Sequence, residues 1–255
     1  MTATTSAAPT PLAAPAPRRV AAQTAMELRL LLRNGEQLLL TVVIPTVVLV
    51  LFTTAELVDV PGDRVDFVMP GVLALAVLST AFTGQAIATG FERRYGVLRR
   101  LGTTPLTRLH LLTAKTAAVV VVEAMQVVLL VVVGYALGWS PQGSPAEAVA
   151  LLLVGTATFS GLGLLLAGTL RAEATLAAAN LLYLLLLVLG GVVVPLSEFS
   201  PAMQDVLSWL PITALSDGLR TVLQNGDSVP AHDWLVLMAW GTAGIGTAAR
   251  LFRWN

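Results

Sequence analysis

Cysteine is absent from the 255-residue chain, histidine occurs twice and lysine once. Without cysteine there are no disulfides, and two histidines as far apart as His110 and His232 do not form a metal-ligand cluster. The single lysine, Lys115, follows Leu-Leu-Thr-Ala instead of the glycine-rich stretch of a phosphate-binding loop. Any ATP that powers this chain is therefore hydrolysed by a different polypeptide.

The same scarcity argues against an enzyme. Ser160 is followed by Gly161, a context that suits an intramembrane nucleophile, but a serine nucleophile needs a base within hydrogen-bond reach. His110 lies in a basic segment between two apolar runs, and His232 precedes the last apolar run. Because neither histidine is placed deep in a helix, we expect a non-catalytic chain.

Charged residues are also scarce, at 12% of the chain against 56% apolar residues. Soluble domains do not reach this balance. Six apolar runs approach the roughly 20 residues that cross the hydrocarbon of a bilayer. The runs are residues 38–54, 67–90, 116–137, 148–170, 175–194 and 234–249. The sequence therefore predicts an all-α integral membrane protein with six transmembrane helices.

The first 36 residues differ from the rest of the chain. Residues 1–17 are an uncharged Ala, Pro and Thr tract that buries too little apolar surface to offset its ordering entropy, so we expect a disordered cytoplasmic tail. Residues 18–36 alternate Leu and Met with charged side chains, which is typical of an amphipathic helix at the membrane interface. Residues 37–255 then form the six-helix domain.

Residues 91–115 determine the predicted orientation, because they hold six cations and one acid, Glu92. Short loops this rich in Lys and Arg stay on the cytoplasmic side. Six crossings then place both termini in the cytoplasm, and of the fifteen cations all but Arg64 and Arg220 lie on that side. The high Ala, Val, Leu and Arg content is typical of a high-GC bacterium, so we expect the bacterial plasma membrane.

Two other segments between apolar runs have helical patterns. Residues 95–101 predict a short helix with Leu98 on its apolar side, ended by Gly102 and Pro105, and another protein can push on such a helix. Residues 195–233 are too apolar for a solvated loop. We expect two short helices there, joined at Pro211 and lying in the outer leaflet.

Two polar side chains inside the apolar runs are candidates for a translocation path. Gln85 lies in the second run, and polar groups at that depth favour protein or a cavity over lipid. Glu123 is the one acid inside a run, about 12 Å beyond Lys115 along a helix. It is either a proton, cation or substrate site, or a buried carboxyl hydrogen-bonded to Thr or Gln of the second run.

Two segments together resemble the signatures of a known family. The first is an acid, a glycine, a Leu-rich turn and Thr-Pro-Leu, and the second lies between the last two predicted helices. Their residues are Glu92, Gly96, Leu98, Leu101 and Pro105, and then Pro195, Phe199, Pro201, Leu210, Pro211, Asp217 and Arg220. Over residues 18–255 the chain resembles the membrane permease subunit of bacterial ABC-2 type transporters, in the drug-export branch that includes daunorubicin-resistance-like permeases.

The resemblance implies a half-transporter with no cofactor of its own and no nucleic acid partner. A second permease copy, identical or related, would stand beside it, and two copies of a cytoplasmic ATPase subunit would bind ATP and Mg²⁺ beneath. Residues 95–104 correspond to the coupling helix that sits in a groove of the ATPase. The residues expected to couple are Glu92, Arg93, Tyr95, Gly96, Val97, Leu98, Arg99, Arg100, Leu101 and Pro105. The expected substrate is hydrophobic or amphiphilic: a drug, a lipid or a natural product.

Other interpretations remain open from the sequence. The arginines also suit binding to anionic lipid headgroups, since membrane lipids are partners in every case. A secondary transporter with Glu123 as its proton site would work without an ATPase and fail in the variant Glu123→Gln. A non-transporting scaffold would leave the activity of any partner ATPase unchanged when substrate is added.

Overall fold

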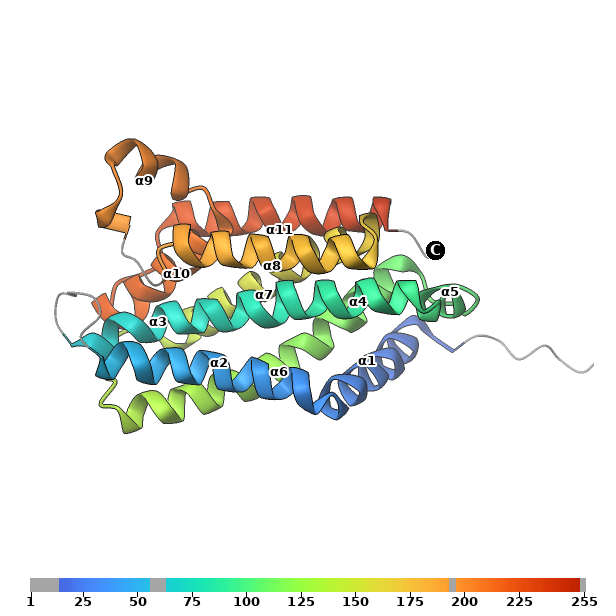
Figure 1. Ribbon diagram of the computed structural model, residues 1–255, viewed down its shortest axis with the longest axis horizontal. Coiled ribbons are helices and arrows are strands. Elements are labelled where there is room, and N and C mark those ends of the chain that lie inside the picture. Colours follow the sequence, from blue (N-terminus) through green and yellow to red (C-terminus); the bar gives the residue numbers. More distant parts are fainter. Residues whose placement is uncertain (1–13, 56–62, 193–195, 253–255) are drawn as a thin grey trace, which may run out of the picture.

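The computed structural model describes residues 14–55, 63–192 and 196–252. Every regular element in these ranges is helical, and the long helices run side by side along the length of the molecule (Figure 1). They are α1 Ala16–Arg33, α2 Gly35–Thr54, α3 Arg64–Val77, η1 Leu78–Gly84, α4 Gln85–Arg94, α5 Val97–Leu101, α6 Arg108–Ala136, α7 Pro145–Thr169, α8 Ala172–Leu189, η2 Leu196–Glu198, α9 Pro201–Leu207, α10 Pro211–Arg220, η3 Thr221–Asn225 and α11 Ala231–Leu251. The all-α prediction is confirmed for the described residues.

Four of the helices are long and apolar enough to cross a membrane: the continuous helix α3–η1–α4 over Arg64–Arg94, α6, α7 and α8. The helices α2 and α11 are not among these four, and the apolar part of α2 is the shorter stretch Thr41–Thr54. The helix α3–η1–α4 is the most buried of the four and α8 the most exposed. Successive long helices alternate in direction, so their ends gather at two opposite ends of the bundle (Figure 1).

The close packing of α7 against α11 depends on small residues. A methyl group added at Gly161 would lie 2.7 Å from the side chain of Ile245, and one added at Gly241 would lie 2.8 Å from the Thr158 hydroxyl. Thr158 also donates a hydrogen bond of 3.0 Å to the Leu237 carbonyl across the same contact. Glycines at these positions let the two backbones approach closely, as in other helix pairs within membranes.

The first helix, α1, begins at Ala16, two residues before the predicted segment 18–36, and ends at Arg33. Its polar Gln23 and Glu27 are buried, and it packs against α6, while Met26 is half exposed. Residues 1–13, most of the predicted tail, lie outside the described ranges.

The segment before α11 contains two short helices, as predicted, and they differ sharply in burial. The helix α9 projects away from the bundle (Figure 1). Val206 in this helix and Trp209 after it are exposed. The helix α10, with Pro211 as its first residue, packs between α3, α7 and α11 and is buried over most of its length. It continues into the π-helix η3, which the sequence pattern did not predict.

Candidate functional site

The predicted coupling residues other than Glu92 and Arg93, which lie in α4, form a sharp corner between α4 and α6, here called the basic corner (residues 95–105). Gly96 has a positive φ of 72°, a conformation that glycine adopts without the penalty that a side chain would carry. This glycine ends the preceding turn, so the helix α5 begins at Val97 instead of Tyr95, and it ends at Leu101 as the pattern predicts. Gly102 and Pro105 follow it, as expected.

Leu98 attaches the basic corner to the bundle. Its side chain is fully buried in a small apolar cluster at this end of the molecule. The cluster consists of Leu98, Leu111, Leu112, Leu164, Ala248 and Phe252. Because these residues come from α5, α6, α7 and the end of α11, the short helix is fixed to three long ones.

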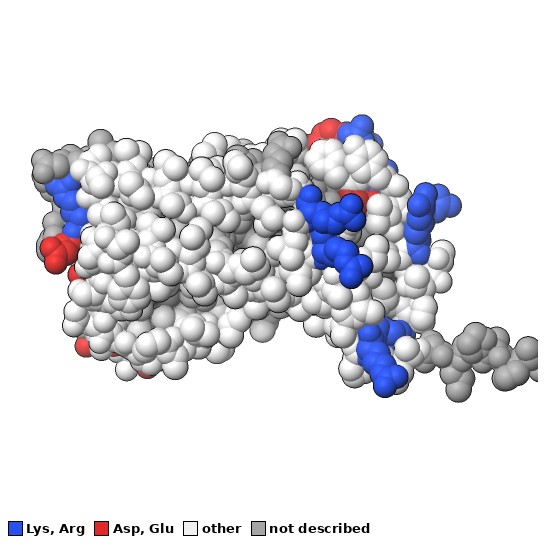
Figure 2. All heavy atoms as spheres, turned by 90° about the horizontal axis from the view of Figure 1, so that it is seen from below, with Lys and Arg blue, Asp and Glu red and all other residues white. Residues whose placement is uncertain are grey.

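The outward side of the basic corner is charged and exposed. Arg99 and Arg100 are exposed and form no ion pair with a described carboxylate, and Tyr95 is 70% exposed while stacking on Phe91 at 6.2 Å between ring centroids. Figure 2 shows Lys and Arg side chains gathered at this end of the molecule. The corner therefore offers a basic surface to another molecule.

Further contacts tie the ends of the long helices to this corner. The Arg93 guanidinium donates to the Leu170 carbonyl, and Arg94 forms an exposed ion pair with Glu173, so α4 is joined to the connection between α7 and α8. Arg19 of α1 donates to the carbonyl of Pro105. Of the predicted coupling residues, Arg93 thus contacts the protein, unlike Arg99 and Arg100.

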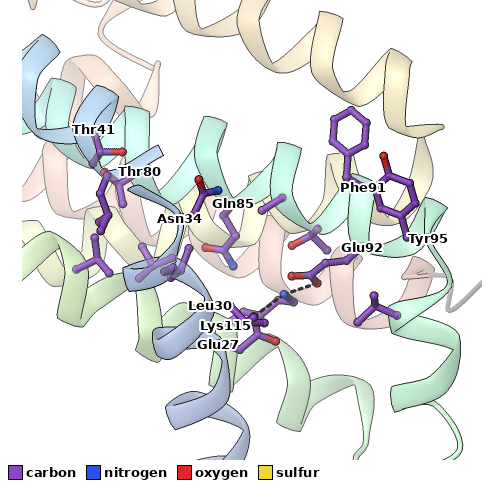
Figure 3. A pocket seen from close by; sticks show the side chains of 17 residues that line it. Glu27, Leu30, Asn34, Thr41, Thr80, Gln85, Phe91, Glu92, Tyr95 and Lys115 are labelled. Atoms are coloured by element: carbon purple, nitrogen blue, oxygen red, sulfur yellow. Dashed lines mark hydrogen bonds and ion pairs between the residues drawn. The ribbon is translucent and has the colours of Figure 1, made fainter. Parts of the chain in front are cut away.

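Glu92 contacts a lysine and not the corner. The Lys115 ammonium lies 2.6 Å from a carboxylate oxygen of Glu92 and 2.8 Å from one of Glu27 (Figure 3). The Lys115 side chain is 4% exposed and the Glu27 side chain 8%, and Gln23 donates to the second oxygen of Glu27 at 2.7 Å. This charge triad (Glu27, Glu92 and Lys115) connects α1, α4 and α6.

The triad was not predicted, because Lys115 was one of six cations taken to set the topology of residues 91–115 and Glu27 had no assigned role. One signal was available: Glu27 is an acid in the middle of a helix whose other charges are basic. Lys115, the only lysine of the chain, directly precedes the apolar run 116–137, where an unpaired ammonium would be costly to bury. Both features favour a pairing, but neither identifies the partners.

A cavity of about 330 Å³, here called the inner cavity, lies behind the basic corner between α1, α4 and α6 (Figure 3). The triad lines it, as does Tyr95, whose exposure shows where the cavity reaches the surface. Gln85, predicted to be in a path, also lines it. The Gln85 carbonyl accepts a 2.5 Å hydrogen bond from Ser160, while its amide nitrogen has no partner among the described residues.

Glu123 lies apart from the inner cavity and is buried. One of its oxygens accepts a 2.7 Å hydrogen bond from Thr156 of α7, and the other has no partner among the described residues. The prediction of a partner on the second run was wrong. In that run, the Thr80 hydroxyl donates to the side-chain carbonyl of Gln126 at 3.0 Å. Gln126 in turn donates to the backbone carbonyl of Thr41 in α2.

A second, larger hollow of about 590 Å³, here called the lateral groove, runs between α2, the η1–α4 segment and α8. Its wall mixes apolar side chains with hydroxyl and amide groups, and the polar members are Asn34, Thr41, Ser79, Thr83, Asn180 and Tyr183. The π-helix η1 supplies Ser79 and Thr83. Such local widening of a helix often occurs at functional sites.

The predicted outer signature is anchored by Arg220. Its guanidinium bonds Asp217 at 3.0 Å and the Gly191 carbonyl at 3.1 Å, and it stacks over the Phe67 ring at 4.4 Å. Burial raises the pKa of the Asp217 carboxyl above its ordinary value, although Arg220 opposes the rise. Pro195 lies outside the described residues. Among the described residues no group of three His, Asp or Glu side chains is arranged to hold a metal ion.

Comparison with known proteins explains this arrangement. The family model of the ABC-2 type transporter matches residues 19–223. The chain belongs to the ABC-2 type transporter family. The matched segment includes the basic corner, the triad, the lateral groove and α10, and it ends before α11. Membership supports a transport permease role, and with its long apolar helices it makes the chain a multi-pass membrane protein.

Two relatives of this ABC-2 chain carry the name transport permease. The chain is 27% identical to ycf38 of Porphyra purpurea over 67% of its own length and 60% of that protein. It is 24% identical to YvfS of Bacillus subtilis (strain 168) over 86% of its own length and 90% of that protein.

Proposed function

We propose that this chain is the membrane subunit of an ATP-driven exporter that moves a hydrophobic or amphiphilic substrate out across the bacterial plasma membrane. The six crossings are α2, α3–η1–α4, α6, α7, α8 and α11, with both termini in the cytoplasm. The observation that carries the proposal is the exposed basic corner, held from within by Leu98. ATP hydrolysis then takes place in two copies of a separate cytoplasmic subunit, which also bind Mg²⁺.

The orientation rests on the distribution of cations along the bundle. The described Lys and Arg residues other than Arg64 and Arg220 lie in α1 and α5, or in or next to the parts of the long helices that gather near them. Segments rich in Lys and Arg remain in the cytoplasm. The basic corner is therefore on the side where a cytosolic ATPase can bind it.

The corner is built to transmit movement. The apolar cluster around Leu98 and the Arg19 contact with Pro105 connect it to α1, α6, α7 and the end of α11. The charge triad in turn joins α1, α4 and α6 to one another. When the ATPase subunits close on ATP, α5 moves as a rigid body and these helices tilt with it. The movement of α5 passes to the long helices through packed side chains, so few other groups have to move.

The lateral groove is the proposed path, completed by a second permease copy. The outward faces of α2 and α8 are apolar and exposed on either side of it, as with Val47 and Leu184. Hydroxyl and amide groups at membrane depth favour a protein-lined cavity over lipid. A second copy placed against α2 and α8 would cover these groups, and the first, second and fifth crossings would then line the path.

The coupling surface can be tested by charge reversal. In the double variant Arg99→Glu/Arg100→Glu we expect loss of co-purification with the ATPase and of ATP-driven export, with normal membrane insertion. The variant Arg171→Glu is the control, because Arg171 is an exposed cation that precedes α8 and does not belong to the basic corner. Normal export by the double variant, or equal loss in the control, would contradict the proposed coupling.

A proton-coupled transporter is the second candidate, because Glu123 has a buried oxygen without a partner among the described residues. An isolated carboxyl at membrane depth is a functional candidate by default. Vesicles that contain the permease without its ATPase decide between the two. Uptake driven by a pH gradient and lost in Glu123→Gln would favour the second candidate, and no uptake without ATP would exclude it.

A further inference from the structure

The inner cavity has an uneven charge that no residue of its wall compensates. The charged side chains that line it are Glu27, Glu92 and Lys115, two carboxylates against one ammonium. Glu27 and Lys115 are almost fully buried, and an uncompensated charge in a region of low dielectric constant is costly. One more positive charge in the cavity would bring the site to neutrality.

We propose that the inner cavity binds an organic monocation with an apolar body, within a single permease copy. The inference rests on the proposed export function, since it names the class of substrate that enters from the cytoplasmic side. The inner cavity adjoins the lateral groove, the proposed path, because Thr41, Ala88 and Phe91 line both. The cationic group contacts Glu92 and Glu27 beside Lys115, and the body of the molecule extends toward Gln85.

The rest of the wall fits this ligand. Leu30, Val119 and Val122 supply apolar surface, and the face of an aromatic ring such as Phe91 attracts a cation. Cavities of a few hundred Å³ with apolar walls and a small number of placed polar groups are typical of small-molecule sites. An anion of the same shape would meet the excess carboxylate and be rejected.

Two buried polar groups at the cavity lack partners, which is independent evidence for a ligand. The Gln85 side chain is 5% exposed and its amide nitrogen makes no hydrogen bond among the described residues. The Thr89 hydroxyl is fully buried and also without a partner there. Buried donors are normally satisfied. Gln85 points into the cavity (Figure 3), where an ether, carbonyl or hydroxyl oxygen of the ligand would accept from it.

The site would also report its occupancy to the coupling surface. Glu92 is near the end of α4, close to the turn that leads into α5. A bound cation competes with Lys115 for the Glu92 carboxylate and so weakens the ion pair between Glu92 and Lys115. Substrate binding would thereby change how firmly the basic corner is held before the ATPase acts on it.

The test measures ligand binding to variants of different charge, using the purified full-length permease without ATPase. The permease is held in discs of phosphatidylcholine, a lipid with no net charge. The probe is radiolabelled tetraphenylphosphonium. Benzyltrimethylammonium and its uncharged isostere neopentylbenzene serve as competitors. We expect saturable binding of the probe that the cation displaces and the isostere does not.

The variants separate net charge from residue identity. Glu27→Gln makes the site neutral and should weaken binding by about tenfold or more, since contacts to a charged group contribute ~1.5–3 kcal/mol. The double variant Glu27→Gln/Lys115→Gln restores one excess negative charge and should restore binding. Lys115→Gln leaves two carboxylates, so binding should tighten and the probe should raise its melting temperature. Glu173→Gln removes an exposed carboxylate of the same end and should change nothing.

Several outcomes would overturn the proposal. Equal binding by Glu27→Gln and the double variant would show that net charge does not matter, as when the two carboxylates share a proton. Loss of binding in Lys115→Gln, or displacement of the probe by neopentylbenzene, would contradict it too. If Glu27→Gln does not fold, Glu92→Gln carries the same charge change. Because no ATPase is present, failure here leaves the coupling result of Arg99→Glu/Arg100→Glu unaffected.

Discussion

The two ends of the molecule are held together in different ways. At the basic end, charged side chains join separate helices: Lys115 links α1, α4 and α6 through Glu27 and Glu92. At the opposite end the ion pair between Asp217 and Arg220 lies within α10, and hydrogen bonds to backbone carbonyls join separate segments. The backbone N–H of Gln142 donates to the Leu223 carbonyl at 3.0 Å, and the indole N–H of Trp240 donates to the Trp209 carbonyl at 2.9 Å.

The difference teaches which end can respond to a ligand or a partner. A carboxylate exchanges one cation for another, so an ionic joint can be loosened by a charged ligand or by movement of a helix. A hydrogen bond to a backbone carbonyl has a fixed partner and contributes only about 0.5–1.5 kcal/mol net. The basic end is thus suited to switching and the opposite end to holding its loops in place.

The largest expected loss of stability comes from removing the Lys115 ammonium from the charge triad. Lys115→Met leaves two carboxylates facing each other and should lower the free energy of unfolding by about 3–5 kcal/mol, as for other broken buried pairs. Unfolding in SDS and detergent mixtures measures it. The triple variant Glu27→Gln/Glu92→Gln/Lys115→Met carries no charge and should recover most of the loss. A cost below about 1 kcal/mol for the single variant would show that the triad is solvated.

A smaller effect is expected at the apolar anchor of the same end. Leu98→Ala removes a fully buried side chain and should cost about 2–5 kcal/mol of unfolding free energy. Tyr95→Ala, next to it but 70% exposed, is the matched control and should cost far less. The same unfolding titration compares them. Similar costs for both substitutions would mean that the corner is not anchored through Leu98.

The smallest effect belongs to the opposite end. Asp66 accepts a 3.0 Å hydrogen bond from the Ser140 backbone, whereas Asp63 makes no side-chain capping bond. Asp66→Ala should cost about 0.5–1.5 kcal/mol, and Asp63→Ala should cost little. A melting-temperature comparison suffices. If Asp66→Ala destabilised the protein more than Leu98→Ala, the proposed contrast between the two ends would be wrong.

Much of the fold could be predicted from the sequence because lipid allows so few solutions. Long apolar runs must satisfy their backbone groups internally, so they form helices. The cation distribution gave a consistent prediction of which helix ends gather together, and Figure 1 shows that arrangement. The short segment 195–233 was also predicted as two helices, since its apolar residues recur at helical spacing.

The site was less predictable, for physical reasons that differ between residues. The partner of Lys115 is 88 positions away at Glu27, and no local pattern encodes such a contact. Gly96 was expected within a helix, but its positive φ depends on how α4 turns into α5. One of the two alternatives for Glu123 had it bond the second run. It bonds Thr156 instead, because packing decides which helices become neighbours.

The central claim is that the basic corner faces the cytoplasm, where an ATPase can bind it. The chain has no cysteine, so Arg99→Cys places one reactive thiol at an exposed position of α5. We predict that a membrane-impermeant maleimide labels this thiol only after the cells are permeabilised. Labelling in intact cells would place the corner outside and contradict the account.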